Sequence, residues 1–188
     1  MKITFGLSLD GWEPLKSPQC LNEATCGPGG FLELLEVRLG LKTNALPLSQ
    51  RLVHYKALLD ELVKERAAFY AESFKRDPYA VAETLLGWRD ALTMAGWDGQ
   101  ASGKDSARLQ DMSALESRTP GRPAPGMGDR LRAVLRELAS RSAHIDVLTV
   151  VEEPEHLPAL WRQVCDKLGA HYAPRQRHVN VGSVPERL

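Results

Sequence analysis

Two short segments with the hydrophobic pattern of β-strands lie near opposite ends of this chain, with mainly helix-like sequence between them. Residues 3–10 alternate apolar and polar side chains, the period expected of a strand with one buried face. Residues 145–151 form a β-branched run of the length typical of a buried strand, and residues 170–172 are predicted to open another. Strands separated by helices favour a parallel sheet. The predicted fold class is therefore α/β, a small parallel sheet flanked by helices.

The segment after the first strand is predicted to contain a loop and two helices. Residues 11–30 are rich in proline and glycine and are predicted to be loop. A short helix is predicted over residues 31–39, ended by Gly40. Ser49 is predicted to cap a longer helix, because the apolar positions of residues 52–69 recur on one helical face.

A second long helix is predicted to pack against the first as a hairpin. The Asp-Pro pair at residues 77–78 marks its start, since Asp accepts backbone hydrogen bonds at a helix N-terminus and Pro fits the first turn. Apolar residues then recur at spacings of four and three, Trp88 among them, until Gly96. Trp88, Trp97 and Trp161 are interpreted as packing anchors; stacking on nucleic-acid bases is the alternative.

A proline- and glycine-rich stretch provides the best internal boundary. Residues 119–128 contain three prolines and three glycines and are predicted to lack regular structure. We expect residues 1–47 to hold the first strand and helix, 48–118 an inserted helical lobe, and 129–188 the remainder of the α/β domain. Asp129 is predicted to cap the helix that follows the boundary.

Composition excludes several classes of protein. The 24 basic and 24 acidic residues balance, so the chain as a whole has no electrostatic attraction to nucleic acid or membrane. No apolar run approaches the roughly 18 residues of a membrane span, and no interaction with a membrane is expected. Three cysteines without a secretory signal are typical of a reducing compartment. The predicted location is cytoplasmic.

Glycine-rich segments suggest a nucleotide site but do not fit one. A phosphate-binding loop needs Lys followed by Ser or Thr after its last glycine, between a strand and a helix. Residues 27–30 precede a helix but lack both residues, and Pro28 has no N–H to donate. Residues 99–105 place Asp105 where a hydroxyl should bind Mg²⁺. No nucleotide and no other cofactor is expected.

Other catalytic and metal-binding patterns are also absent from the sequence. A PD-(D/E)XK nuclease centre needs an acidic residue two positions before a Lys, and none of the eight lysines has one. Ser8 lies in a predicted strand without the flanking glycines of a nucleophile elbow. Cys20 and Cys26 are too far apart for half of a zinc site. We expect no catalytic residue and no metal ligand.

One helix carries a cluster of arginines. Arg130, Arg132 and Arg136, with Arg141 beyond them, lie on the helix predicted after the boundary, partly offset by acidic residues. Such a strip suits contacts with the DNA phosphate backbone. A solvated helix face is the alternative. The three residues Arg130, Arg132 and Arg136 are the candidate site.

Several segments, read in order, resemble the N-terminal helicase-like region of AddB/RecC-like proteins of the PD-(D/E)XK nuclease family. They are the strand and loop start at residues 3–11, the helix at 31–41, the Asp-Pro pair at 77–78, the Leu-Gly-Trp-Arg-Asp segment within 86–97, and Leu-Pro-Ala-Leu-Trp at 157–161. The resemblance covers most of the chain, but its motifs are structural ones.

This resemblance implies a degenerate helicase-like domain in a helicase–nuclease subunit that processes DNA double-strand breaks for recombination. The nuclease site of such proteins lies near their far C-terminus, so no catalytic residue carries over to this chain. The implied role is a scaffold that contacts DNA weakly and without sequence preference, or a partner helicase–nuclease subunit, or both. A stand-alone α/β protein-interaction domain and an enzyme with an unfamiliar site are the alternatives.

Overall fold

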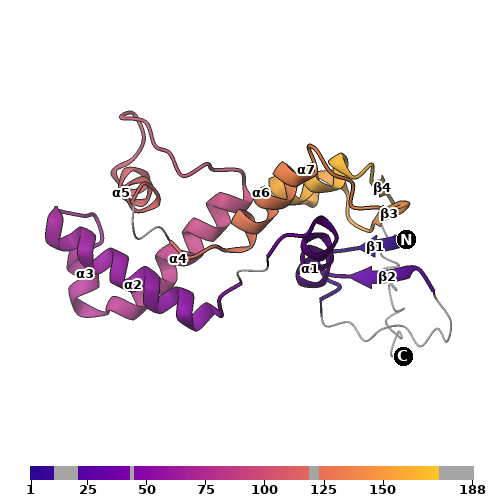
Figure 1. Cartoon of the computed structure of the whole chain (residues 1–188). Coiled ribbons are helices and arrows are strands. Elements are labelled where there is room, and N and C mark those ends of the chain that lie inside the picture. Colours follow the sequence, from indigo (N-terminus) through magenta and orange to yellow (C-terminus); the bar gives the residue numbers. More distant parts are fainter. Residues whose placement is uncertain (11–20, 43–44, 119–122, 174–188) are drawn as a thin grey trace, which may run out of the picture.

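The computed structural model describes residues 1–10, 21–42, 45–118 and 123–173, which form a body and a lobe (Figure 1). The elements of the body are β1 (Lys2–Phe5), β2 (Glu23–Cys26), α1 (Pro28–Leu39), α6 (Met127–Glu137), β3 (Val147–Val150), the 3₁₀ helix η1 (Pro154–His156), α7 (Ala159–Lys167) and β4 (His171–Tyr172). The lobe consists of α2 (Leu48–Glu65), α3 (Ala71–Arg76), α4 (Pro78–Met94) and α5 (Ala107–Glu116). No described helix is both long and apolar enough to cross a membrane.

The body is built on a parallel sheet with the strand order β2-β1-β3-β4. The α/β fold class with a small parallel sheet is therefore confirmed. The prediction that residues 11–30 are all loop was wrong, because β2 lies within that range. Its sequence Glu-Ala-Thr-Cys is short, and its side chains are exposed or only half-buried. Backbone hydrogen bonds to β1 hold this strand in the sheet, and such bonds produce no hydrophobic pattern in the sequence.

One face of the sheet carries the core of the body. Ile3 and Phe5 of β1 lie beside Leu148 and Val150 of β3 in the paired register, and all four are buried. Residues of α1, α6 and α7 pack onto them in one apolar cluster. Trp161 is 1% exposed, and its ring centroid lies 4.8 Å from that of Phe5. Trp161 is a core residue, as the sequence predicted.

The lobe is a helical hairpin of α2 and α4, as predicted, with α3 between them in the sequence. Its apolar core includes Tyr55, Leu59 and Leu85. Asp77 caps α4, since its carboxylate accepts the Ala80 N–H at 3.0 Å. Two predictions for α2 were wrong. Its N-cap is Pro47 and not Ser49, and the helix ends at Glu65 instead of continuing to residue 69.

Trp88 is not buried between α2 and α4, contrary to the prediction. Its side chain is 42% exposed. The buried face of α4 instead includes Leu85, Arg89 and Thr93. Arg89 is buried because carboxylates from other helices neutralise it, so a charged residue takes the interior position that the apolar spacing assigned to its neighbour Trp88.

The predicted boundary at residues 119–128 is partly helical. Residues 119–122 lie outside the described residues, but α6 already begins at Met127 and includes Gly128. A Cβ at Gly128 would lie 2.5 Å from the Thr93 Cγ2 atom, so this glycine permits α6 to approach α4 closely. Asp129 is not the N-cap of α6; Gly126 takes that place, and the Asp129 carboxylate accepts the Gly126 N–H at 2.8 Å. Helix α6 therefore contacts the lobe as well as the body.

Candidate functional site at the joint between lobe and body

Arg89 is the centre of a buried set of ion pairs at the joint. Its side chain is 3% exposed. The Arg89 Nε donates to Glu116 of α5 at 2.6 Å, and its Nη1 donates to Asp129 of α6 at 2.7 Å. The Arg89 Nη1 also lies 3.2 Å from the Asp90 carboxylate. One guanidinium thereby connects α4, α5 and α6.

Arg51 extends the ion pairs to α2. It binds Asp90 with two parallel hydrogen bonds of 2.8 and 2.7 Å. Its Nε donates to the Ala124 carbonyl at 3.4 Å. Bidentate pairing of this kind fixes orientation as well as distance. All four helices in contact with Arg51, Arg89 and their partners are consequently held in one arrangement.

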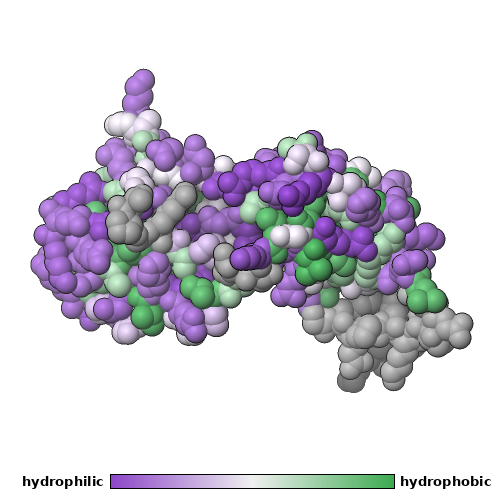
Figure 2. Space-filling view, viewed as in Figure 1, coloured by the Kyte–Doolittle hydropathy of each residue, from purple (hydrophilic) through white to green (hydrophobic). Residues whose placement is uncertain are grey.

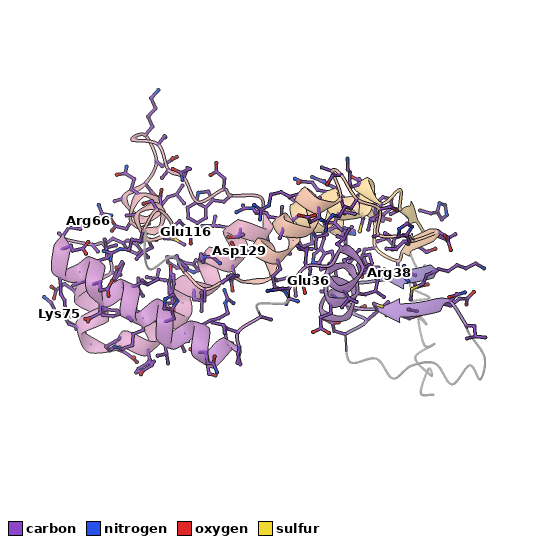
Figure 3. The ribbon with its side chains drawn as sticks, viewed as in Figure 1. Glu36, Arg38, Arg66, Lys75, Glu116 and Asp129 are labelled. Carbon is purple, nitrogen blue, oxygen red and sulfur yellow. The ribbon has the colours of Figure 1, made fainter. Side chains whose placement is uncertain are left out.

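A separate buried pair attaches α6 to α1. The Arg130 Nε and Nη2 atoms each lie 2.7 Å from a carboxylate oxygen of Glu36. Glu36 is buried, and this pairing raises the pKa of Arg130. Figure 3 shows Glu116, Asp129 and Glu36 one after another along the long axis of the molecule. Three carboxylates from three helices thus bind arginines at the joint, and the Asp129–Arg89 pair connects the body to the lobe.

The charge state of Asp129 depends on Arg89. Burial favours the neutral acid, but the hydrogen bonds and the charge of Arg89 outweigh it and lower the pKa of Asp129. The Gly126 N–H and the nearby charge of Arg132 act in the same direction. Asp129 therefore stays ionised at neutral pH in the folded chain.

A cavity of about 780 Å³ opens beside these ion pairs, between α6 and the segments that lead to and from the lobe. Its charged lining consists of five basic and three acidic residues: Lys42, Arg89, Arg130, Arg132, Arg136, Glu36, Asp98 and Asp129. All three arginines of the candidate strip therefore reach the same cavity. Leu41, Leu135 and Leu160 contribute apolar surface to it. Figure 2 shows hydrophilic side chains over the boundary between the two parts.

The three candidate arginines differ in their surroundings. Arg130 is bound to buried Glu36, whereas Arg132 donates to the Trp97 carbonyl. Arg136 is exposed and has no polar side-chain partner among the described residues. Sequence reasoning missed Lys42, which is also exposed on this cavity, because it follows the end of α1 far from the arginine strip in the chain.

The carboxyl edge of the sheet is the place where parallel α/β folds bind phosphates. Here the N-terminus of α1 is capped by Asp10, whose carboxylate oxygens accept the Gly29 N–H at 2.9 and 3.2 Å. A Cβ at Gly27 would lie 2.1 Å from the Asp10 backbone nitrogen. Glu152, after β3, accepts the Leu7 N–H at 2.8 Å. Two carboxylates thus accept hydrogen bonds from backbone N–H groups at this edge. The sequence predicted neither of these contacts.

Metal and thiol chemistry find no support in the described part of the chain. No group of three or more His, Cys, Asp or Glu side chains there could hold a metal ion. Burial raises the pKa of the Cys165 thiol to about 12, and burial with the charge of Asp10 raises that of Cys26. Both thiols are poor nucleophiles at neutral pH. Cys20 lies outside the described residues.

Comparison of the chain with protein-family models, with curated proteins and with solved structures finds no match.

Proposed function

We propose that this chain is a non-catalytic, helicase-like scaffold segment of a helicase–nuclease subunit of the PD-(D/E)XK type, which acts in the repair of DNA double-strand breaks by recombination. The observation that supports this proposal most is at the carboxyl edge of the parallel sheet, where the Asp10 and Glu152 carboxylates accept backbone N–H groups. We call this edge closed. The domain that contains the sheet also carries an inserted helical lobe. We interpret this arrangement as a helicase-like domain without a working nucleotide site. The sequence resemblance to AddB/RecC-like proteins supports the same assignment.

The electrostatics of the closed edge support a role without ATP. A phosphate at the N-terminus of α1 would need free backbone N–H groups and a cation. The Asp10 carboxylate already accepts the Gly29 N–H and would repel a phosphate. Pro28 at the start of α1 offers no N–H at all. The proposed partners are DNA, bound weakly and without sequence preference, or a partner helicase–nuclease subunit, or both.

We expect isothermal titration calorimetry to detect no binding of ATP with Mg²⁺ by the purified chain. Gly30→Asp is the matched variant: a Cβ there approaches only Cys26 at 3.9 Å, so the substitution fits and adds a negative charge in the first turn of α1. Saturable micromolar binding by the natural chain that Gly30→Asp abolishes would show a working nucleotide site and contradict the proposal.

The repair role predicts a phenotype in the source cells. Disruption of the gene should make them more sensitive to agents that break both DNA strands. A copy that carries Gly30→Asp should restore resistance fully, because the scaffold does not use ATP. Survival curves measure both outcomes. Unchanged survival after disruption would argue for the alternative, a stand-alone α/β interaction domain outside repair.

A further inference from the structure

We propose that the cavity at the joint binds a short acidic peptide segment of a partner protein, in which carboxylate side chains lie beside aliphatic ones. The carboxylates contact Lys42, Arg132 and Arg136, and the aliphatic side chains contact the leucines of the cavity wall. The cavity lies away from the closed edge of the sheet, so it is a separate site. The proposal goes beyond the scaffold role, because it does not depend on DNA repair.

Two arginines of the cavity lining are already neutralised. Arg89 binds Glu116 and Asp129, and Arg130 binds Glu36. A ligand could recruit either guanidinium only by leaving buried carboxylates unpaired, which is costly. These pairs therefore fix the shape of the cavity, and a ligand must be bound by the other charged residues of the lining.

The other charged residues of the lining carry an excess of positive charge. They are Lys42, Arg132 and Arg136, against the single carboxylate of Asp98. Lys42 and Arg136 are exposed and have no polar side-chain partner within the described ranges. Arg132 donates to the Trp97 carbonyl through Nη2, which leaves further N–H groups of its guanidinium for a ligand. This excess favours an anionic ligand by charge complementarity.

The spacing of the arginines on α6 suits carboxylates. Arg132 and Arg136 lie one turn apart, where like charges repel each other. Carboxylates beside them replace this repulsion with charge-assisted hydrogen bonds, and the planar guanidinium matches a carboxylate with two parallel bonds. Arg130 of the same helix already binds Glu36 in this way, with two contacts of 2.7 Å. A segment with several carboxylates therefore fits this side of α6.

The uncharged part of the lining favours a peptide over a nucleic acid. It includes Leu41, Leu135 and Leu160, and none of the described residues that line the cavity is aromatic. Single-stranded nucleic acids bind through aromatic side chains on which their bases stack, together with a basic groove. An aliphatic side chain of a peptide instead buries its surface against leucines without any aromatic partner. The apolar lining thus matches leucine-like side chains between the carboxylates.

The size of the cavity limits the ligand to a short segment. Its volume of about 780 Å³ is that of a small-molecule pocket, so a few residues of peptide enter it but a folded domain does not. Gln163 of α7 is exposed on the lining. Its amide can donate to a peptide carbonyl and accept from a peptide N–H. Inorganic phosphate would use neither this amide nor the leucines.

The test is fluorescence anisotropy of the full chain with the labelled, C-terminally amidated peptide Asp-Glu-Leu-Leu-Asp-Glu at low salt. We expect saturable binding that the double variant Lys42→Ala, Arg136→Ala weakens by about tenfold, since two partly exposed ion pairs are lost. Both residues are exposed, so the variant should keep its fold, which circular dichroism checks. Arg76→Ala is the matched control, because Arg76 is an exposed arginine of the lobe outside the cavity lining.

Altered peptides test the two parts of the recognition separately. Asn and Gln in place of the acidic residues remove the charge and should abolish binding. Ser in place of both leucines should weaken binding by about tenfold, the effect of one well-buried aliphatic side chain. Undiminished binding of either altered peptide would refute the proposed mode of recognition.

Competition separates the peptide from other anions. Unlabelled peptide should displace the probe at lower concentration than tripolyphosphate or a single-stranded oligonucleotide with the same number of negative charges. Equal or better displacement by the oligonucleotide would assign the cavity to nucleic acid, and by tripolyphosphate to anions in general; either result overturns the proposal. So would no binding at low salt, unchanged binding by the double variant, or an equal loss with Arg76→Ala. Survival after gene disruption tests the proposed function separately, since neither result depends on the other.

Discussion

Trp161→Ala is expected to destabilise the chain by about 3–5 kcal/mol, the usual cost of removing a buried aromatic side chain. The Trp161 ring of α7 lies against Phe5 of β1 and Phe31 of α1, with centroid distances of 4.8 and 5.8 Å. Its removal leaves a void among three elements that cannot collapse together without disturbing the strand register. Urea unfolding followed by circular dichroism measures the loss.

Trp88→Ala is the matched control for this prediction. Both changes delete an indole from a helix, but Trp88 is 42% exposed whereas Trp161 is 1% exposed. We expect the control to cost less than about 1 kcal/mol, since surface substitutions have small effects. Similar losses for the two variants would mean that Trp88 is covered in solution and that the body core is less tightly packed than described.

Arg89→Met should cost about 3–5 kcal/mol, because removing one partner of buried ion pairs leaves uncompensated charge. Glu116, which is 6% exposed on its side chain, and Asp129 would both lose their cation. Methionine keeps much of the side-chain length, so the lost stability reflects the missing charge more than the missing volume. Arg76→Ala, at an exposed site, serves as the control. A loss below about 1 kcal/mol in urea would contradict the central role of Arg89.

The effect of Arg89→Met should shrink as the pH falls. In the natural chain the pKa of Asp129 is lowered, so its contribution to stability is present above the usual Asp pKa of about 3.9 and is lost as the pH falls through the folded-state pKa. In the variant, burial without Arg89 should raise that pKa, so protonation then relieves the buried charge. Unfolding curves at pH 7 and pH 4 measure the difference.

Local signals in the sequence predicted those parts of the fold that local chemistry determines. Gly40 ends α1 with a φ of 68°, a left-handed conformation that glycine adopts easily. Asp77 and Pro78 begin α4 as expected. The β-branched run near the C-terminal end became β3. In each case the residues that determine the structure lie within a few positions of one another.

The failures occurred where distant residues decide the structure. Arg89 is interior because Glu116 and Asp129 bind it, 27 and 40 residues further along the chain. The candidate strip on α6 was predicted as one surface. In the structure Arg130 binds Glu36, which lies 94 residues before it in the chain, whereas the other two arginines do not bind Glu36. No periodicity or composition rule relates residues across such distances. The cavity became recognisable only once α1, α4 and α6 were placed together.

The long interval between the central strands sets an order of assembly during synthesis. β1 pairs with β3, and the Leu7 N–H binds Glu152, 145 residues later in the chain. The lobe, by contrast, pairs α2 with α4 through neighbouring sequence. Contacts that are close in sequence form faster than distant ones. A ribosome would therefore release a folded lobe while β1 can pair only with β2, and the open edge of β1 would be exposed to aggregation or to chaperones until β3 is made.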